Sequence, residues 1–339
     1  MVARISAQDF INQGLSMRLN NAIFHIAVIT MTLFASCQKE QKIEIAVIPK
    51  GTTQVYWKSV HAGAEKAAQE LSVNVIWQGP QKEDDREMQI NVMQNFISRG
   101  VDAIVLAPLD EVALVRPVKS ALKRNIKVII IDSDLSESIY STFVATDNYA
   151  GGKLAAKYMA KLLNGKGNVL VLRFSEGSAS TTKREMGFLE GIAEYAPEIH
   201  IVSKDQFGGV IAESAMQVGQ NLLNRFPDLD GIFCPNESTT FGFLRALQIA
   251  GKAGQVKLIG FDASDPLIEG LKAKEIHGLV VQNPFQIGYL GVKSACAVLN
   301  GEKVEPRIDT GVHLLTLENL DDPDMKEIVF PDIKKWLNE

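Results

Sequence analysis

Several carboxylate and amide side chains stand where predicted β-strands end. They are Asp132, Asn236, Asp262 and Gln282, which end or follow the strands expected at 128–131, 231–234, 257–261 and 279–282. The carboxyl ends of parallel strands share one edge of a sheet, and ligands of open α/β folds bind at that edge. A carboxylate accepts charge-assisted hydrogen bonds from hydroxyl groups, and an amide both donates and accepts. We therefore expect these side chains to bind the hydroxyl groups of a small molecule.

Two aromatic residues and one arginine extend this candidate site. Tyr56 and Trp57 follow the first predicted strand and open a helix. A flat aromatic ring covers the apolar C–H face of a sugar while its O–H or N–H stays available for hydrogen bonding. Arg184 lies in the first turns of the predicted helix 182–195, where the helix dipole disfavours a cation, and it offers a fork of donors. We expect all three to contact the ligand.

Each of these residues also has a purely structural interpretation. Tyr56 and Trp57 can be core aromatics, and Asp132 can be a solvated turn residue. Arg184 can be a surface residue paired with Glu185 or Glu190.

The elements that must position these residues alternate regularly between strand and helix. Residues 43–131 give four strands that alternate with three helices, and the pattern starts again with a helix at about residue 149 and runs to residue 282. Such alternation indicates parallel, doubly wound sheets. Two sets of this size predict an α/β protein with two similar lobes. Asp147 or Asn148 is placed to cap the helix 149–164.

The first 37 residues differ from the rest of the chain. Residues 22–34 form an apolar run of 13, which fits a secretory signal and is too short to span a membrane. Arg18 supplies the positive charge before it, and Met17 is a candidate true start. Small residues then precede Cys37 as in a bacterial lipobox, with Phe34 where leucine is commonest. We expect a signal peptide at 1–37, a lipid on Cys37 that holds the protein on a membrane, and a polar tether at 38–42. The alternative is an ordinary signal peptide with an incidental cysteine.

Composition excludes several other classes of protein. A net charge of −5 without a basic block argues against nucleic acid as a partner. The five histidines show no paired metal-ligand spacing and there is no Cys-x-x-Cys, so we expect no metal and no cofactor. Gly177-Ser178 lacks the second glycine of a nucleophile elbow, which argues against an enzyme. Cys234 and Cys296 are expected to be buried free thiols rather than a disulfide.

Short motifs in a fixed order give the chain a family resemblance over residues 43–316. They are Tyr56-Trp57 with Gly63-Ala64, Ile131-Asp132, Ala145-Thr146-Asp147-Asn148 with Gly151-Gly152, Arg184-Glu185-Met186-Gly187-Phe188, Pro235-Asn236-Glu237, Ile259-Gly260-Phe261-Asp262, and Gln282 before Pro284-Phe285-Gln286-Ile287-Gly288. In this order the chain resembles the sugar-binding proteins of bacterial ABC transporters, of the ribose- and galactose-binding class. That class shares its type I periplasmic binding protein fold with the effector domains of lactose-repressor-type regulators.

The resemblance implies two lobes joined by three hinge crossings and closing around one ligand. The first lobe would comprise 43–146 plus 283–311, and the second 147–282 plus 312–339, with Asp147, Asn148 and Asn283 at the hinge. Ser133 stands where ribose binders often have arginine, and this difference enlarges the pocket. Ser133, Gln206 and Phe207 are further candidate contacts. The implied protein is a monomer that delivers a sugar or polyol to an ABC permease.

Two related functions also use this fold. A transcriptional regulator would need a helix-turn-helix where this sequence has a signal and lipobox. A sensory protein would report ligand binding to a chemoreceptor or sensor kinase, and the sequence alone leaves that alternative to transport open.

Overall fold

The computed structural model describes residues 42–337. The expected signal peptide, Cys37 and all but the last residue of the expected tether lie outside the described residues. No helix within 42–337 is both long enough and apolar enough to cross a membrane.

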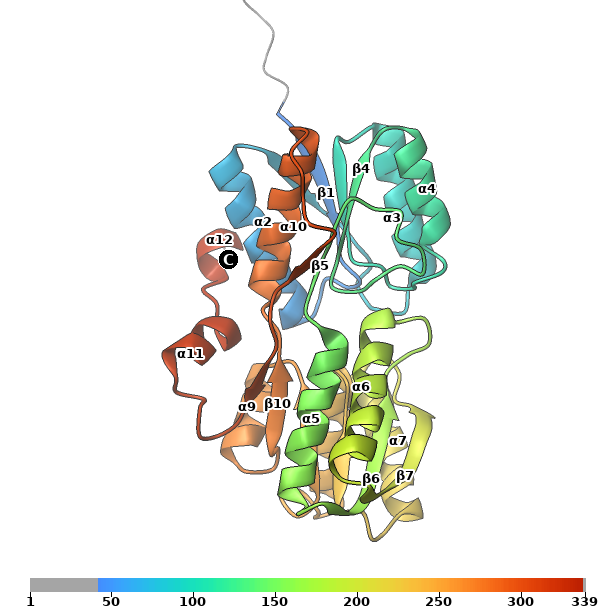
Figure 1. Ribbon diagram of the computed structural model, residues 1–339, viewed down its shortest axis with the longest axis vertical. Coiled ribbons are helices and arrows are strands. Elements are labelled where there is room, and N and C mark those ends of the chain that lie inside the picture. The colour runs from blue at the N-terminus through green and yellow to red at the C-terminus, as the bar shows by residue number, and fades with distance from the viewer. Residues whose placement is uncertain (1–41, 338–339) are drawn as a thin grey trace, which may run out of the picture. The chain divides into compact units, whose positions relative to one another are not determined.

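The first lobe is a six-stranded sheet with helices on both faces (Figure 1). Its strand order is β11-β5-β4-β3-β1-β2, and every neighbouring pair is parallel. The elements are β1 (Glu44–Ile48), α2 (Val55–Leu71), β2 (Asn74–Trp77), α3 (Arg86–Arg99), β3 (Ala103–Leu106), α4 (Val115–Lys123), β4 (Lys127–Ile131), β5 (Phe143–Ala145), α10 (Pro284–Leu299) and β11 (Arg307–Asp309).

The second lobe repeats this arrangement with the strand order β12-β10-β9-β8-β6-β7. Its elements are α5 (Asn148–Leu162), β6 (Lys166–Arg173), α6 (Ala179–Tyr195), β7 (Glu198–Phe207), α7 (Ala212–Arg225), β8 (Gly231–Phe233), α8 (Glu237–Ile249), β9 (Lys257–Phe261), α9 (Asp265–Lys272), β10 (Gly278–Val281) and β12 (His313–Leu315). The prediction of two α/β lobes built on mainly parallel sheets is confirmed.

The central strands read as apolar runs because both of their faces are covered. Successive residues of a strand point to opposite faces, so Ile45 and Val47 join the cluster under α2 and α10, while Ala46 and Ile48 join the cluster under α3 and α4. All four are fully buried. Cys234 and Cys296 are buried free thiols, as expected.

The chain passes three times between the two sheets. These crossings lie at 146–147 between β5 and α5, at 282–283 between β10 and α10, and at 310–312 between β11 and β12. Asp147 caps α5 by accepting a hydrogen bond from the N–H of Ala150, and Asn283 caps α10 by accepting one from Gln286. β11 runs toward the cleft in the first lobe, and the chain continues in the same direction into β12 of the second lobe. β12 therefore runs away from the cleft and is antiparallel to β10, which runs toward the cleft.

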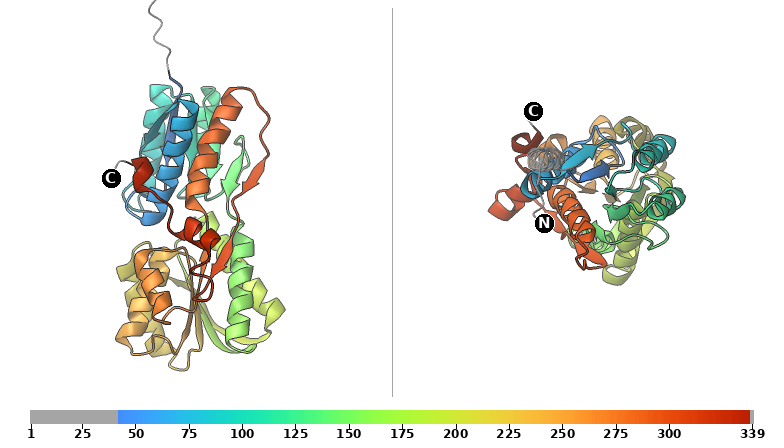
Figure 2. Two further views of the ribbon diagram at one scale, coloured as in Figure 1. Left: turned by 90° about the vertical axis from the view of Figure 1, so that its left-hand side faces the viewer. Right: turned by 90° about the horizontal axis from the view of Figure 1, so that it is seen from above.

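The last helix lies on a different lobe from the one expected. α11 (Pro323–Val329) buries Met325 in the core of the second lobe, but α12 (Lys334–Leu337) packs against α2 of the first lobe (Figures 1 and 2). The Nζ atom of Lys66 on α2 lies 6.0 Å from the centre of the Trp336 ring, which gives α12 a cation–π contact there. The expectation that 312–339 belongs wholly to the second lobe is therefore corrected for α12.

In the first lobe, α2 and α10 lie side by side and touch backbone to backbone (Figure 2). A Cβ atom added to Gly63 would lie 1.9 Å from the carbonyl oxygen of Phe285, and one added to Gly288 would lie 1.9 Å from that of Val60. Only glycine permits this approach, which brings the start of α2 and Tyr56 close to the sheet.

The second lobe repeats the same contact between α5 and α6. A Cβ on Gly152 would lie 2.1 Å from the carbonyl oxygen of Arg184, and one on Gly187 would lie 2.1 Å from that of Tyr149. In both lobes, each glycine lies three residues after the residue of its own helix whose carbonyl faces the glycine of the partner helix. This contact fixes the height of Arg184 above the sheet.

Replacement of Gly152 by alanine should therefore destabilise the protein. We expect Gly152→Ala to lower the free energy of unfolding by about 1–3 kcal/mol, because the added methyl group meets backbone that cannot move aside. Urea denaturation measures this change. Gly270→Ala is the control, since its Cβ would meet only the ends of the Leu244 and Ile276 side chains, which can shift. Equal stability of Gly152→Ala and the unmodified protein would contradict this account.

Candidate functional site

Two aspartates occupy equivalent positions in the two lobes. Asp132 follows β4 and Asp262 follows β9, each the third strand from the same side of its sheet. Both have left-handed backbones, with φ of 62° and 69°. The N–H of Asp132 donates to Val144 at 3.0 Å and that of Asp262 donates to Val280 at 2.8 Å, so each turn is tied to the next strand. Aspartate tolerates this conformation better than most residues, and the carboxylates leave the sheets at the edges that face the cleft.

On the first lobe, Asp132 is held by a lysine and a tyrosine. The Lys50 Nζ atom lies 2.9 Å from Asp132 Oδ2, and the Tyr56 hydroxyl donates to Oδ1 at 2.7 Å. Both charged side chains are only 5% exposed, so each compensates the buried charge of the other. Burial and the adjacent Asp132 charge raise the pKa of Tyr56 well above its ordinary value, so its hydroxyl stays protonated and donates.

The Trp57 ring is almost fully buried, so little of its face is free to stack on a ligand. It is 1% exposed, its indole Nε1 donates to Glu83 Oε1 at 2.6 Å, and its ring meets that of Tyr56 edge-on with centroids 5.0 Å apart. Burial raises the pKa of Glu83, against the opposing effects of the Lys50 charge and the indole hydrogen bond. Trp57 therefore both borders the cavity and fixes a carboxyl group in it.

On the second lobe, Arg184 is buried among compensating groups. Its guanidinium carbon lies 3.8 Å from the centre of the Phe261 ring, and its Nη1 lies 3.8 Å from Asp262 Oδ2. Nη1 also donates to the carbonyl of Pro235 at 2.8 Å, and Nε donates to Asn148 Oδ1 at 2.7 Å. Asn148 begins α5 beside a lobe crossing, so the cation is fixed directly to that crossing.

The surface interpretation of Arg184 is excluded by these contacts. Arg184 is 3% exposed, and the neighbouring carboxyls are paired elsewhere. Glu185 accepts from Arg173 Nε at 2.7 Å, and Glu190 accepts from the Tyr149 hydroxyl.

Asp262 and its neighbours complete the second-lobe side. Gln282 Nε2 donates to Asp262 Oδ1 at 2.6 Å. Burial raises the pKa of Asp262, and the Arg184 charge and this hydrogen bond oppose the rise. Asn236 caps α8, and its Oδ1 accepts from Thr239 Oγ1 at 2.6 Å. Glu237, the first residue of α8, has its pKa raised to about 7 by burial and by the charges of Asp262 and Glu83.

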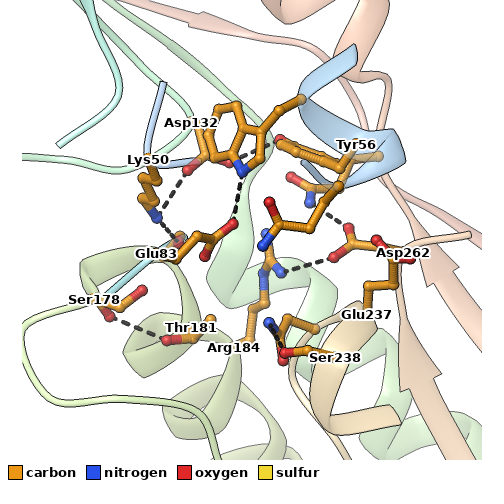
Figure 3. Close-up of a pocket in the computed structure, with 15 residues that line it drawn as sticks. Lys50, Tyr56, Glu83, Asp132, Ser178, Thr181, Arg184, Glu237, Ser238 and Asp262 are labelled. Carbon is orange, nitrogen blue, oxygen red and sulfur yellow. Dashed lines mark hydrogen bonds and ion pairs between the residues drawn. The ribbon is translucent and has the colours of Figure 1, made fainter. Parts of the chain in front are cut away.

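These groups meet in one cavity between the lobes (Figure 3). All seven residues expected to bind ligand line it: Tyr56, Trp57, Asp132, Arg184, Asn236, Asp262 and Gln282. Eight further residues line the cavity and were not predicted from the sequence: Lys50, Gln54, Glu83, Ser178, Ser180, Thr181, Glu237 and Ser238.

Protein contacts bridge the cleft, so the two lobes are closed on each other. Lys50 Nζ donates to Ser180 Oγ at 3.0 Å, and the N–H of Ser180 donates to Ser133 Oγ at 3.1 Å. At the rim, the N–H of Glu111 donates to the carbonyl of Gly177 at 3.0 Å. Ser133, expected as a further ligand contact, thus joins the lobes and does not line the cavity.

Gln206 and Phe207 also lie away from the cavity lining. Both belong to β7, the edge strand of the second lobe, in which Gln206 lies opposite Leu172 and Phe207 lies opposite Arg173. The Arg173 guanidinium covers the Phe207 ring at 4.5 Å. Continued pairing with β6 keeps both residues at the sheet edge, so we withdraw them as candidate contacts.

The cavity wall has hydrogen-bonding capacity that the protein does not use. Four buried side-chain atoms have neither a hydrogen-bond partner nor an ion-pair partner among the described residues: Gln54 Oε1, Ser178 Oγ, Glu237 Oε2 and Gln282 Oε1. The two amide oxygens and the ionised form of Glu237 can only accept, so the complementary ligand is rich in donors, as hydroxylated compounds are. Within residues 42–337 no cluster of His, Cys, Asp and Glu is placed to hold a metal ion.

Two lobes of matching topology that close on a polar cavity define a two-lobed solute-binding protein. The sequence matches the family model described as periplasmic binding protein domain over residues 45–303, and the chain belongs to this family. The family is one of exported binding proteins and not of enzymes.

Characterised relatives and solved structures agree with this assignment. The chain is 29% identical to the ribose import binding protein RbsB of Escherichia coli, over 86% of this chain and 96% of that protein. A carbohydrate transporter solute-binding protein from Agrobacterium radiobacter, solved with D-arabinose, superposes with a TM-score of 0.82 at 34% identity and covers 86% of this chain and all of that one. An ABC transporter solute-binding protein from Agrobacterium vitis, solved with D-fucose, gives 0.81 at 38% identity, with 85% of this chain and all of that one covered.

The raised pKa of Glu237 predicts that the ligand-free protein loses stability as pH rises. The folded state keeps the proton that the unfolded chain releases near pH 4.5, so stability falls between about pH 4.5 and pH 7. A shift of this size corresponds to about 3 kcal/mol, and the raised pKa values of Glu83 and Asp262 add in the same direction.

Thermal unfolding at pH 5 and pH 8, after removal of bound solute, measures this effect. Glu237→Gln should unfold at a higher temperature than the unmodified protein at pH 8 and show a smaller loss between the two pH values. Glu213→Gln, at an exposed position on α7, is the control. A Glu237→Gln variant with an unchanged pH dependence would contradict the assignment.

Proposed function

We propose that this protein is the solute-binding component of an ABC importer and captures a sugar or sugar-like molecule between its lobes. The observation that supports this most is the convergence of Asp132 and Asp262, with their cationic partners, on one closed cavity that retains unused acceptors. Carboxylates and amides on facing walls bind a ligand whose hydroxyl groups point in several directions. The ligands named for the related structures, D-arabinose and D-fucose, have this character.

Closure of the lobes on the ligand is the proposed mechanism of capture. Ligand contacts to Asp132 and Tyr56 on one lobe and to Arg184 and Asp262 on the other exist together only in the closed arrangement. A ligand that binds both walls therefore favours that arrangement, as differential affinity requires. The crossings at Asp147, Asn148 and Asn283 are the proposed hinges, and an ABC permease is the proposed partner that recognises the closed form.

A screen of pentoses, hexoses, polyols and nucleosides by thermal shift tests this proposal, because a ligand that binds only the native state raises the melting temperature. With the best compound, Asp262→Asn and Arg184→Gln should each weaken binding by at least about 1.5–3 kcal/mol, the scale of hydrogen bonds to charged groups. Asparagine is used because it accepts the left-handed backbone at residue 262.

Isothermal titration calorimetry measures these affinities. Gln206→Ala, on the edge strand β7, should bind as the unmodified protein does. Full affinity in both cleft variants, or no shift with any compound in the screen or with its amino derivatives, would refute the proposed function.

We also propose that the mature protein is a monomeric lipoprotein attached to a membrane through Cys37. The support is the small-residue sequence before Cys37, since acyl chains on one cysteine anchor a protein through about 0.8 kcal/mol per buried methylene. Palmitate labelling in a bacterial host should be lost in Cys37→Ala while the protein is still exported. Labelling that persists in this variant would exclude Cys37 as the attachment site.

A further inference from the structure

The cavity contains more carboxyl groups than cations. Lys50 pairs with Asp132 at 2.9 Å, and Arg184 pairs with Asp262 at 3.8 Å. Each aspartate therefore has its own buried cation, which compensates the cost of removing its charge from water. Both lobes thus pair a buried aspartate with a buried cation, although Lys50 follows strand β1 and Arg184 lies on helix α6.

Glu83 and Glu237 do not follow this rule. In the part of the chain that the structure describes, neither forms an ion pair, although both line the cavity. Glu83 comes from the loop after β2 on the first lobe and Glu237 from the start of α8 on the second, so they reach the cavity from opposite walls (Figure 3). Their charges act on each other, because Glu83 contributes to the raised pKa of Glu237.

The carboxyl groups of Glu83 and Glu237 differ in their hydrogen bonding. Glu83 Oε1 accepts the indole N–H of Trp57 at 2.6 Å, while Glu237 Oε2 is buried without a hydrogen-bond partner. Without a cation, each of these partly buried carboxyl groups holds its proton more strongly in the ligand-free cavity, as the raised pKa values of Glu83 and Glu237 indicate, and a cationic ligand can take the place of that proton. A hydroxyl group would supply a hydrogen bond but no charge, whereas a protonated amine supplies both.

We propose that Glu83 and Glu237 select the charge of the ligand, so that the site takes a polyhydroxylated compound with one protonated amine, of the amino-sugar or amino-polyol class. The ammonium group lies between the two carboxylates, and the hydroxyl groups meet Asp132, Asp262 and Gln282. Sugar acids and sugar phosphates are rejected, because each adds negative charge beside carboxylates that already lack cations. This inference rests on the proposed function and narrows its substrate class.

The test compares ligands that differ only in charge. The neutral sugar with the largest shift in the screen described above is titrated alongside its amino-deoxy derivatives at each hydroxyl position and its aldonic and uronic acids, by calorimetry at pH 7. At least one amino derivative should bind about tenfold more tightly than the neutral parent, and both acids at least about tenfold more weakly. The advantage of the amine should shrink to below about threefold in Glu83→Gln and in Glu237→Gln. Glu213→Gln should retain the full advantage.

The results separate this inference from the proposed function. If neutral sugars bind but no amino derivative binds more tightly than its parent, the charge assignment is wrong and the proposed function stands. The assignment is also wrong if the advantage of the amine persists in both glutamine variants. If no neutral or amino compound binds, the proposed function fails and this inference fails with it.

Discussion

Burial of charge at the facing edges of two sheets is the constraint on which the rest of the structure depends. Asp132 is 4% exposed and Asp262 is 8% exposed, and each follows a strand and has a left-handed backbone. A carboxylate in such a place persists only where donors and cations surround it. Lys50 and Tyr56 meet this need on one lobe, and Arg184 and Gln282 meet it on the other. The polar character of the cleft follows from this requirement.

Helix packing then determines how accurately these groups are placed. Tyr56 and Arg184 reach the aspartates because the helices that carry them, α2 and α6, lie close to the sheets. In each lobe two helices touch backbone to backbone through a pair of glycines, Gly63 with Gly288 and Gly152 with Gly187. In the second lobe one of the contacted carbonyls belongs to Arg184 itself, so side-chain position and helix packing are set by the same contact. Asn148 then links this arginine to a lobe crossing.

The sequence predicted those parts of the fold and site whose position in space follows from a local pattern along the chain. Strand and helix alternation predicted the two lobes, since buried parallel strands read as apolar runs whatever their neighbours. The rule that polar residues after strands meet at one edge found Asp132, Asn236 and Asp262. The same rule applied to Lys50, two residues after β1, would have found it too. Glu83 gave no such signal, because it lies in a loop several residues after β2. Its carboxyl group is held at the cavity by the hydrogen bond from the Trp57 indole. The positions of Gln206 and α12 depended on sheet pairing and on packing against α2, which no local pattern encodes.

The terminal segment of the described chain adds a constraint on motion that the three crossings alone would not impose. α11 is fixed in the core of the second lobe and α12 lies on α2 of the first, with residues 330–333 between them. Any rotation of one lobe against the other must either bend this four-residue segment or detach α12. As long as α12 stays on α2, a fluorophore attached to it travels with the first lobe, and its distance from a second fluorophore on α7 reports the angle between the lobes.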